Sequence, residues 1–448
     1  MRALLKDIEA IPALTRFGRV ARIEGLCVEV TGAQGAVSLG GQCRISIGNK
    51  KVIPCEVIGF RDGRALVMPL GSLDGITLGA RADFEDRAPS IHPSRAWLGR
   101  VLNGFGEAMD GKGKLPQGAT AYPLKAPPPP ATARARIGAK LDLGIRALNQ
   151  FVTCCKGQRM GIFAGSGIGK STLLAMLARN SNADAIVIGL IGERGREVKE
   201  FIEDDLGPEG LRRSVVIAAT SDEAPLVRRQ AAYVAMTVAE GLRDAGLNVL
   251  LLMDSVTRFA MAQREIGLSA GEPPASKGYT PTVFAELPRL LERAGPGMDR
   301  TDMKGQGSIT GLFTVLVEGD DHNEPVSDAV RGILDGHIVL DRAIAERGRF
   351  PAINVLRSVS RVMPGCNSED EQNLVLRAKK PLTIYEDMAE LIRLGAYKAG
   401  TNPEVDSAVK LYPQLEAFLG QKKDEQSGLS EGYAALRTIL DGAEGRVG

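Results

Sequence analysis

A glycine-rich run near the middle of the 448-residue chain has the residue types and spacing of a phosphate-binding loop. It follows an apolar stretch, Met160–Phe163, and leads into a helix-like stretch that begins at Leu173. Glycines let the backbone bend until several N–H groups converge on phosphate oxygens, and the N-terminus of the following helix adds its dipole. The residues predicted to hold a nucleotide are Gly165, Ser166, Gly167, Ile168, Gly169, Lys170, Ser171 and Thr172.

Two residues of this run have more specific expected roles. Lys170 is expected to reach the β- and γ-phosphates, and the hydroxyl of Ser171 is expected to bind Mg²⁺. The usual pattern begins with glycine, and this chain has Ala164 at that position. A small side chain still fits there, so the run predicts binding of a nucleoside triphosphate together with Mg²⁺.

Two other strand-like stretches end in carboxylates. Val249–Met253 stops at Asp254, and Ala185–Ile191 leads into a charged segment that contains Glu193 and Glu197. Because ligands of open α/β sheets bind beyond the carboxyl ends of the strands, Asp254 is well placed to hold Mg²⁺ through water. A carboxylate after the other strand would hold the attacking water and accept its proton. The residue types alone do not choose between Glu193 and Glu197.

The surrounding pattern predicts an α/β protein with three domains and a short N-terminal segment. Residues 1–16 form an amphipathic stretch expected to bind a partner, and residues 17–88 alternate short β-branched runs with turn signals, which is typical of a small β-barrel. Over residues 89–364, strand-like and helical runs alternate, which predicts a P-loop ATPase domain with a mostly parallel sheet flanked by helices. Residues 365–448 predict an α-helical C-terminal domain. Its first two helices are expected over Asp370–Ala378 and Tyr385–Gly395.

Composition excludes several classes of protein. A net charge of +2 argues against a dedicated nucleic-acid binder, which usually carries a strong basic excess. No run of 18 apolar residues occurs, so no membrane-spanning helix is expected, and residues 1–16 lack the apolar stretch of a secretory signal. The six cysteines have no metal-ligand spacing. We therefore expect free, buried thiols in a reducing cytoplasm.

Five stretches of the chain resemble those of type III export ATPases. They are Gly161–Ser171, Gly189–Val198, Pro273–Ala285, Glu318–Pro325 and Ile333–Leu340. The resemblance extends over nearly the whole chain, and these enzymes are similar in turn to the catalytic subunits of rotary ATP synthases. It implies a RecA-like nucleotide-binding domain between the barrel and the helical domain, with ATP and Mg²⁺ as ligands and ATP hydrolysis as the reaction.

Carried over residue by residue, the resemblance assigns further roles. Glu193 is the implied catalytic carboxylate that polarises water, and Arg194 is implied to contact the γ-phosphate region. Arg361 stands where the family supplies an arginine finger to the neighbouring subunit's site. Phe350 stands where relatives place an aromatic ring against the adenine.

The chain departs from the family pattern at two positions. Asn354 stands where relatives usually have Asp, and Lys277 stands where many have Arg. Neither residue is expected to touch the phosphates, so the departures concern the ring pore or the subunit interfaces.

The resemblance also implies partners and a place in the cell. The chain would form a homohexamer in the cytoplasm, peripherally associated with the inner-membrane export apparatus. Its implied partners are regulator and stalk proteins, the membrane export gate, and export substrates with their chaperones, without nucleic acid. One alternative is the closely similar ATPase of a virulence injectisome. A second alternative is a Rho-like RNA translocase, but that would need a basic, aromatic-bearing N-terminal domain, which the predicted barrel lacks. A third alternative is an assembly scaffold in which turnover is incidental.

Overall fold

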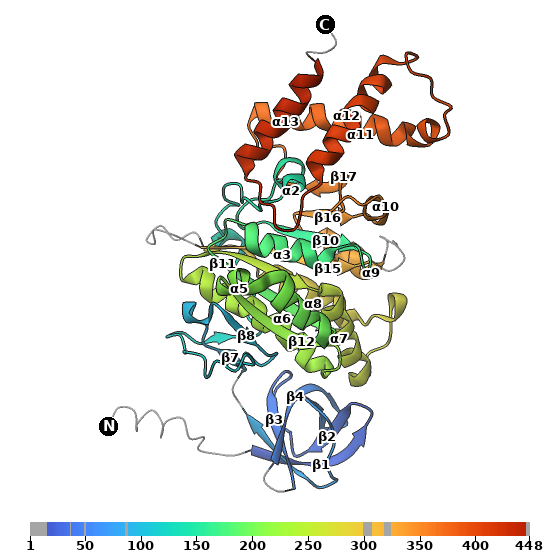
Figure 1. Ribbon diagram of the computed structural model, residues 1–448. Coiled ribbons are helices and arrows are strands. Elements are labelled where there is room, and N and C mark those ends of the chain that lie inside the picture. The colour runs from blue at the N-terminus through green and yellow to red at the C-terminus, as the bar shows by residue number, and fades with distance from the viewer. Residues whose placement is uncertain are drawn as a thin grey trace.

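Three structural parts follow one another along the chain in the computed structural model (Figure 1). The structure describes residues 16–35, 37–48, 51–85, 88–298, 307–317 and 324–444. A small barrel lies at one end, a large sheet with flanking helices lies in the middle, and three long helices lie at the other end (Figure 1). This arrangement confirms the predicted fold class. The predicted partner-binding segment, residues 1–16, lies outside the described residues except for Arg16.

The N-terminal part is a closed six-stranded antiparallel barrel with the strand order β1-β2-β5-β4-β3-β6. Its core holds alternate, mostly β-branched residues of the strands, such as Val28, Val30 and Val57, which are fully buried. Closure of the barrel pairs the edge strands with each other and leaves no free edge. The strands are β1 (Arg16–Glu24), β2 (Cys27–Thr31), β3 (Gln42–Ile47), β4 (Lys51–Arg61), β5 (Arg64–Pro69) and β6 (Arg81–Glu85).

The central sheet has the order β17-β16-β10-β15-β13-β11-β12-β8, and β14 also pairs with β15. Neighbouring strands are parallel except at the pairs β16–β17 and β14–β15. Both faces are covered by helices, which explains why β11 and β13 read as continuous apolar runs rather than as alternating ones. The strands are β8 (Arg100–Leu102), β10 (Arg159–Ala164), β11 (Ala185–Glu193), β12 (Ser214–Thr220), β13 (Asn248–Asp254), β14 (Gly295–Pro296), β15 (Ser308–Leu316), β16 (Gly336–Leu340) and β17 (Ile353–Ser360).

Two apolar cores lie on opposite faces of this sheet. One core contains α3 and reaches the C-terminal helices, whereas the other contains α6, α7 and α8. The helices of this part are α2 (Arg146–Phe151), α3 (Lys170–Asn180), α4 (Gly195–Glu200), α5 (Gly207–Arg212), α6 (Pro225–Asp244), α7 (Val256–Ala270), α8 (Pro281–Leu291), α9 (Pro325–Ile333) and α10 (Arg342–Glu346). Shorter elements are β7 (Ser90–Ile91), β9 (Tyr122–Pro123), η1 (Arg95–Trp97), η2 (Ala131–Ala133), η3 (Phe201–Leu206) and η4 (Ser276–Gly278).

The C-terminal part consists of α11 (Glu369–Arg393), α12 (Pro403–Leu419) and α13 (Leu429–Glu444). The prediction of two separate helices over Asp370–Ala378 and Tyr385–Gly395 was wrong, because α11 runs through both. Pro381 lies inside this helix and is buried there. A proline inside a helix removes one backbone hydrogen bond, but packing against neighbouring helices outweighs that loss here.

Candidate functional site

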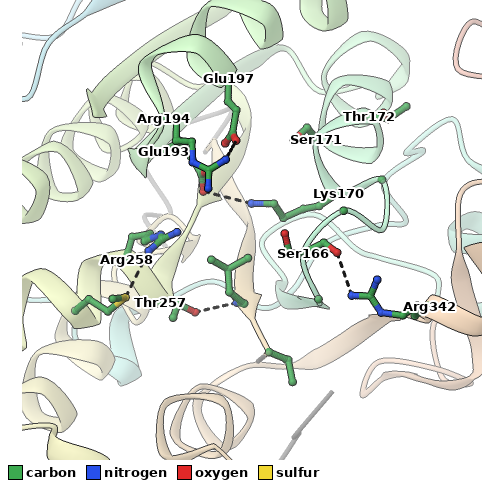
Figure 2. Close-up of a pocket in the computed structure, with 16 residues that line it drawn as sticks. Ser166, Lys170, Ser171, Thr172, Glu193, Arg194, Glu197, Thr257, Arg258 and Arg342 are labelled. Carbon is green, nitrogen blue, oxygen red and sulfur yellow. Dashed lines mark hydrogen bonds and ion pairs between the residues drawn. The ribbon is translucent and has the colours of Figure 1, made fainter. Parts of the chain in front are cut away.

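The glycine-rich loop forms one wall of a cavity of about 630 Å³ at the carboxyl edge of the central sheet (Figure 2). It joins the end of β10 to the start of α3, and Gly167 and Gly169 adopt φ values of 77° and 90° that favour glycine. Of the predicted loop residues, Ile168 points into the apolar core instead of the cavity. The cavity is lined by Gly165, Ser166, Gly167, Gly169, Lys170, Ser171, Thr172, Glu193, Arg194, Glu197, Thr257, Arg258, Met261, Leu316, Val317 and Arg342.

Parallel strands bring three charged residues together at this edge of the sheet, where Lys170 and Glu193 line the cavity and Asp254 is buried beside Lys170. Lys170, at the start of α3, forms ion pairs with Asp254 at the end of β13 and with Glu193 at the end of β11, the latter at 3.4 Å. Thr314 donates a hydrogen bond of 2.7 Å to Asp254. The predictions of Lys170, Glu193 and Asp254 from three separate stretches thus fall on one cluster, because those strands end at the same edge.

Burial and charge act in opposite directions on Lys170. Burial disfavours its ammonium, but the carboxylates of Asp254 and Glu193 outweigh burial and hold the pKa of Lys170 above its ordinary value. One ammonium therefore faces two carboxylates. The two carboxylates, together with the hydroxyl of Ser171 that lines the cavity, are hard oxygen donors of the kind that Mg²⁺ prefers. The donor set at this edge therefore fits a magnesium ion that accompanies a nucleotide.

The structure distinguishes the two carboxylates that follow β11. Glu193 faces Lys170, whereas Glu197 is exposed on α4 and pairs with Arg194 at 3.3 Å. Burial raises the pKa of Glu193; the ammonium of Lys170 lowers it, the carboxylate of Asp254 raises it, and the net pKa lies above the ordinary value of 4.5. A partly buried carboxylate with a raised pKa is better suited to accept a proton than an exposed one. The geometry therefore favours Glu193 as the proton acceptor.

Arg258 is a residue of this cavity that the sequence did not single out. It lies on the first turn of α7, four residues after Asp254, and its side chain packs against Gly192 (Figure 2). Among the described residues its Nε has no hydrogen-bond partner although the atom is buried. Its position one helical turn after the strand-end carboxylate Asp254 is the sequence feature that could have identified it. Arg258 thus adds a cation next to Glu193.

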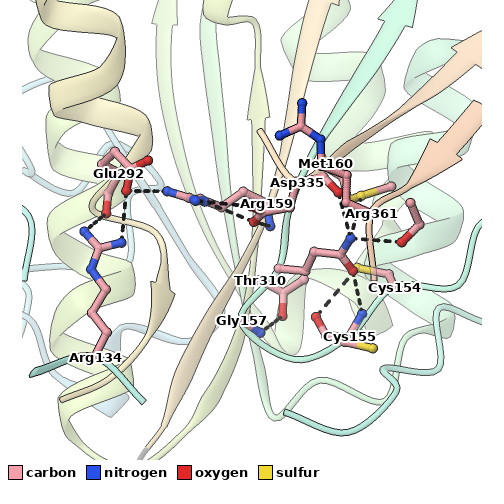
Figure 3. Close-up of polar contacts among 12 residues, drawn as sticks. Arg134, Cys154, Cys155, Gly157, Arg159, Met160, Glu292, Thr310, Asp335 and Arg361 are labelled. Atoms are coloured by element: carbon pink, nitrogen blue, oxygen red, sulfur yellow. Dashed lines mark hydrogen bonds and ion pairs between the residues drawn. The ribbon is translucent and has the colours of Figure 1, made fainter. Parts of the chain in front are cut away.

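Phe350 and Arg361 do not line this cavity. A Cβ atom built on Gly169 would lie 3.4 Å from the Phe350 ring, so that ring borders the loop from outside and is about half exposed. Arg361 follows β17; its backbone N–H donates to Asp335, which in turn pairs with Arg159 at the start of β10 (Figure 3). The phosphate loop follows the other end of β10, roughly 16 Å away at the rise of an extended strand. Arg361 therefore lies far from the phosphate loop of its own chain.

The two departures from the family pattern lie apart from the cavity. Asn354 is buried and donates a hydrogen bond of 3.0 Å to Asp341, which an aspartate could not do without a proton. Lys277 lies exposed in η4 with a positive φ of 47°.

At pH values above the folded-state pKa of Glu193, replacing Glu193 by glutamine is expected to stabilise the ligand-free protein. Because this pKa is raised, the ionised carboxylate costs stability at higher pH, and that cost vanishes as the pH falls below 4.5. The melting temperature of Glu193→Gln should therefore exceed that of the wild type at neutral pH, and the difference should shrink on acidification. Thermal melting across pH, with the exposed Glu203→Gln as control, measures it. A Glu193→Gln variant that melts below the wild type at neutral pH would contradict the argument.

Comparisons with known proteins agree with the geometry of the cavity and the order of the domains. The model of the ATP synthase alpha/beta family, nucleotide-binding domain, matches residues 144–360, and the model of the T3SS EscN ATPase C-terminal domain matches residues 367–438.

Among the described helices, none contains an apolar stretch of membrane-spanning length.

Proteins of two related export systems are similar to the chain over nearly its full length. It is 58% identical over 440 residues to the flagellum-specific ATP synthase of Caulobacter vibrioides, which covers 98% of this chain and 99% of that one. It is 43% identical over 441 residues to the type 3 secretion system ATPase of Xanthomonas euvesicatoria, with 98% of each chain covered. A solved structure of the assembled ATPase EscN with its central stalk EscO, from enteropathogenic E. coli, superposes with a TM-score of 0.84 at 38% identity, covering 94% of this chain and 100% of that one. By sequence and by fold, the chain is an ATPase and belongs to the family of flagellar type III export ATPases, the flagellum-specific ATP synthases.

Proposed function

We propose that this chain hydrolyses MgATP as a homohexameric ring and thereby drives unfolding, chaperone release and loading of substrates for flagellar type III export. The observation that carries the proposal is the division of the catalytic groups. Lys170 and Glu193 line one cavity and Asp254 is buried beside it against Lys170, whereas Arg361 lies near the opposite end of β10. A second copy of the chain has to supply Arg361 if that residue acts on the phosphates.

The predicted site residues in and around the cavity have proposed tasks. The N–H groups of the loop and the ammonium of Lys170 bind the phosphates, and Arg194 contacts the γ-phosphate region. Glu193 orients the attacking water and accepts its proton. Ser171 and Asp254 would hold Mg²⁺, which supplies charge neutralisation when it is bound with the nucleotide. Phe350 borders the loop where the adenine is proposed to lie.

The proposed partners follow from the relatives. EscN has been solved with its central stalk EscO, which supports a stalk partner inside a ring of this chain. An export regulator, the membrane gate, and chaperones with their substrates complete the proposal, with the ring in the cytoplasm at the inner membrane.

An injectisome is the second candidate setting. EscN and the ATPase from Xanthomonas euvesicatoria belong to type III secretion systems, and both are similar to this chain over nearly its full length. The identity of 58% to a flagellum-specific relative, against 43% and 38%, favours the flagellar setting.

Specific ATPase activity is expected to rise steeply with protein concentration. A site that needs a second copy is complete only after assembly, so dilution removes the arginine finger from each site. Activity per subunit, measured over a range of protein concentrations alongside the mass of the particles in solution, tests this dependence. Constant specific activity across the transition from monomer to ring would refute the shared site.

A further inference from the structure

Arg342 lies on the rim of the cavity, on the side away from Glu193 (Figure 2). It is the first residue of α10, and its Nη2 donates a hydrogen bond of 3.1 Å to the backbone carbonyl of Ser166 in the phosphate loop. The two residues are 176 positions apart in the sequence. They meet because β16, which ends two residues before Arg342, pairs in parallel with β10, which leads into the loop.

The backbone around Arg342 is itself held in place. Asp341 caps the N-terminus of α10 by accepting a hydrogen bond of 2.9 Å from the N–H of Ala343. The same carboxylate accepts a bond of 3.0 Å from the amide of the buried Asn354. A second carboxylate at position 354 would repel that of Asp341, so the asparagine suits this cap. The main chain from which the Arg342 side chain extends is therefore held in one position.

A fixed rim arginine matters because of the glycines in the loop. Gly167 and Gly169 give the loop many accessible backbone conformations, and the loop must be ordered before its N–H groups can converge on phosphates. A hydrogen bond from the guanidinium of Arg342, an exposed side chain on a backbone that is held in place, to the carbonyl of Ser166 removes part of that freedom before the nucleotide arrives. Pre-ordering of this kind strengthens binding by lowering the entropic cost of association.

We propose that Arg342 is a positioning residue that holds the phosphate loop ready for a nucleoside triphosphate, and that Asp341 and Asn354 act through it. This inference rests on the proposed role of the loop in phosphate binding. A positioning residue acts on affinity, whereas the residues that act on water and the transferred phosphoryl group act on turnover.

The test compares full-length variants by steady-state MgATP hydrolysis and by equilibrium titration with a fluorescent ADP analogue. Arg342→Ala is expected to raise KM and the Kd of the analogue about 10-fold, which corresponds to about 1.4 kcal/mol, while kcat changes by less than about 3-fold. Arg342→Lys is expected to restore both constants to within about 3-fold of the wild type, because an ammonium also donates to a carbonyl. Arg347→Ala, at the other end of α10, is the matched control and is expected to leave both constants within about 2-fold.

A double-mutant cycle tests the supporting residues. Asn354→Asp should raise the Kd about 3-fold in the wild type and have no further effect in Arg342→Ala, because its action passes through Arg342. Equal effects in both backgrounds would show that Asn354 acts by another route and would overturn that part of the proposal.

Several outcomes would overturn the role of Arg342. These are an unchanged KM and Kd in Arg342→Ala, an equal loss in Arg347→Ala, or a fall in kcat alone. Should Arg342→Ala fail to fold in a thermal melt, Arg342→Met keeps the apolar stem and is judged by the same criteria. Lys170→Ala, titrated in parallel, separates a failure of the proposed phosphate-binding role of the loop from a failure of the positioning role of Arg342. Wild-type affinity in Lys170→Ala would refute the role of the loop itself, whereas lost affinity there beside normal affinity in Arg342→Ala would refute only the positioning role.

Discussion

Glu193→Gln is expected to lower kcat by about 10²–10⁴-fold while the protein still binds nucleotide, because a positioned general base contributes about that much to a proton transfer. Glutamine keeps the size of the side chain but cannot accept the proton of the attacking water. Nucleotide affinity should persist because Lys170 and the loop remain unchanged. Single-turnover hydrolysis and titration with a fluorescent ADP analogue measure the two quantities separately.

Glu197→Gln is the matched comparison for this variant. Glu197 lines the same cavity but is exposed and paired with Arg194, so its loss is expected to lower kcat by less than about 10-fold. Lys170→Ala should instead abolish both binding and turnover. A Glu193→Gln variant with full activity, or a larger loss in Glu197→Gln, would show that Glu193 is not the general base.

Arg361→Ala is expected to lower kcat by about 10³–10⁵-fold, the contribution usual for an arginine finger. Its effect on the nucleotide affinity of its own chain should be small, because Arg361 does not line the cavity of that chain. Steady-state hydrolysis at a protein concentration that saturates assembly measures the loss. Arg347→Ala, an exposed arginine just after α10 that does not line the cavity, serves as control here too and should retain most of the activity.

Mixing two inactive variants sharpens this prediction. In a ring assembled from Lys170→Ala and Arg361→Ala chains, some interfaces join an intact loop to an intact finger. With random assembly this holds at about a quarter of the interfaces, since each interface is a head-to-tail contact between two copies. Activity should therefore reappear on mixing. Continued inactivity of rings shown to contain both variants would place the finger in its own chain or remove its role.

Sequence reasoning found the parts of the site that are local in the chain. The loop up to Thr172 and the strand-end carboxylates carry their signals in a few neighbouring residues, and the parallel sheet brings strand ends together by its own geometry. Residue types and spacing alone left Glu193 and Glu197 open, and only the family resemblance implied Glu193. The contact of Glu193 with Lys170 that supports this choice is tertiary, so the spacing of residues could not reveal it.

The residues that sequence reasoning missed depend on packing between distant segments. Arg342 reaches the loop only because β16 lies beside β10, and Arg258 gains its place from the packing of α7 against β11. The continuous helix α11 was missed for a related reason. Pro381 reads as a helix breaker in the sequence, and only the contacts of that helix with its neighbours offset the lost hydrogen bond.

The most direct measurement is an experimental structure of the assembled protein with Mg²⁺ and a transition-state analogue such as ADP–aluminium fluoride. We expect the phosphates within hydrogen-bonding distance of Lys170 and the loop, Glu193 beside the attacking water, and Arg361 of the adjacent copy at the fluoride. An analogue bound elsewhere, or an Arg361 remote from every boundary between copies, would contradict a catalytic site shared by two chains.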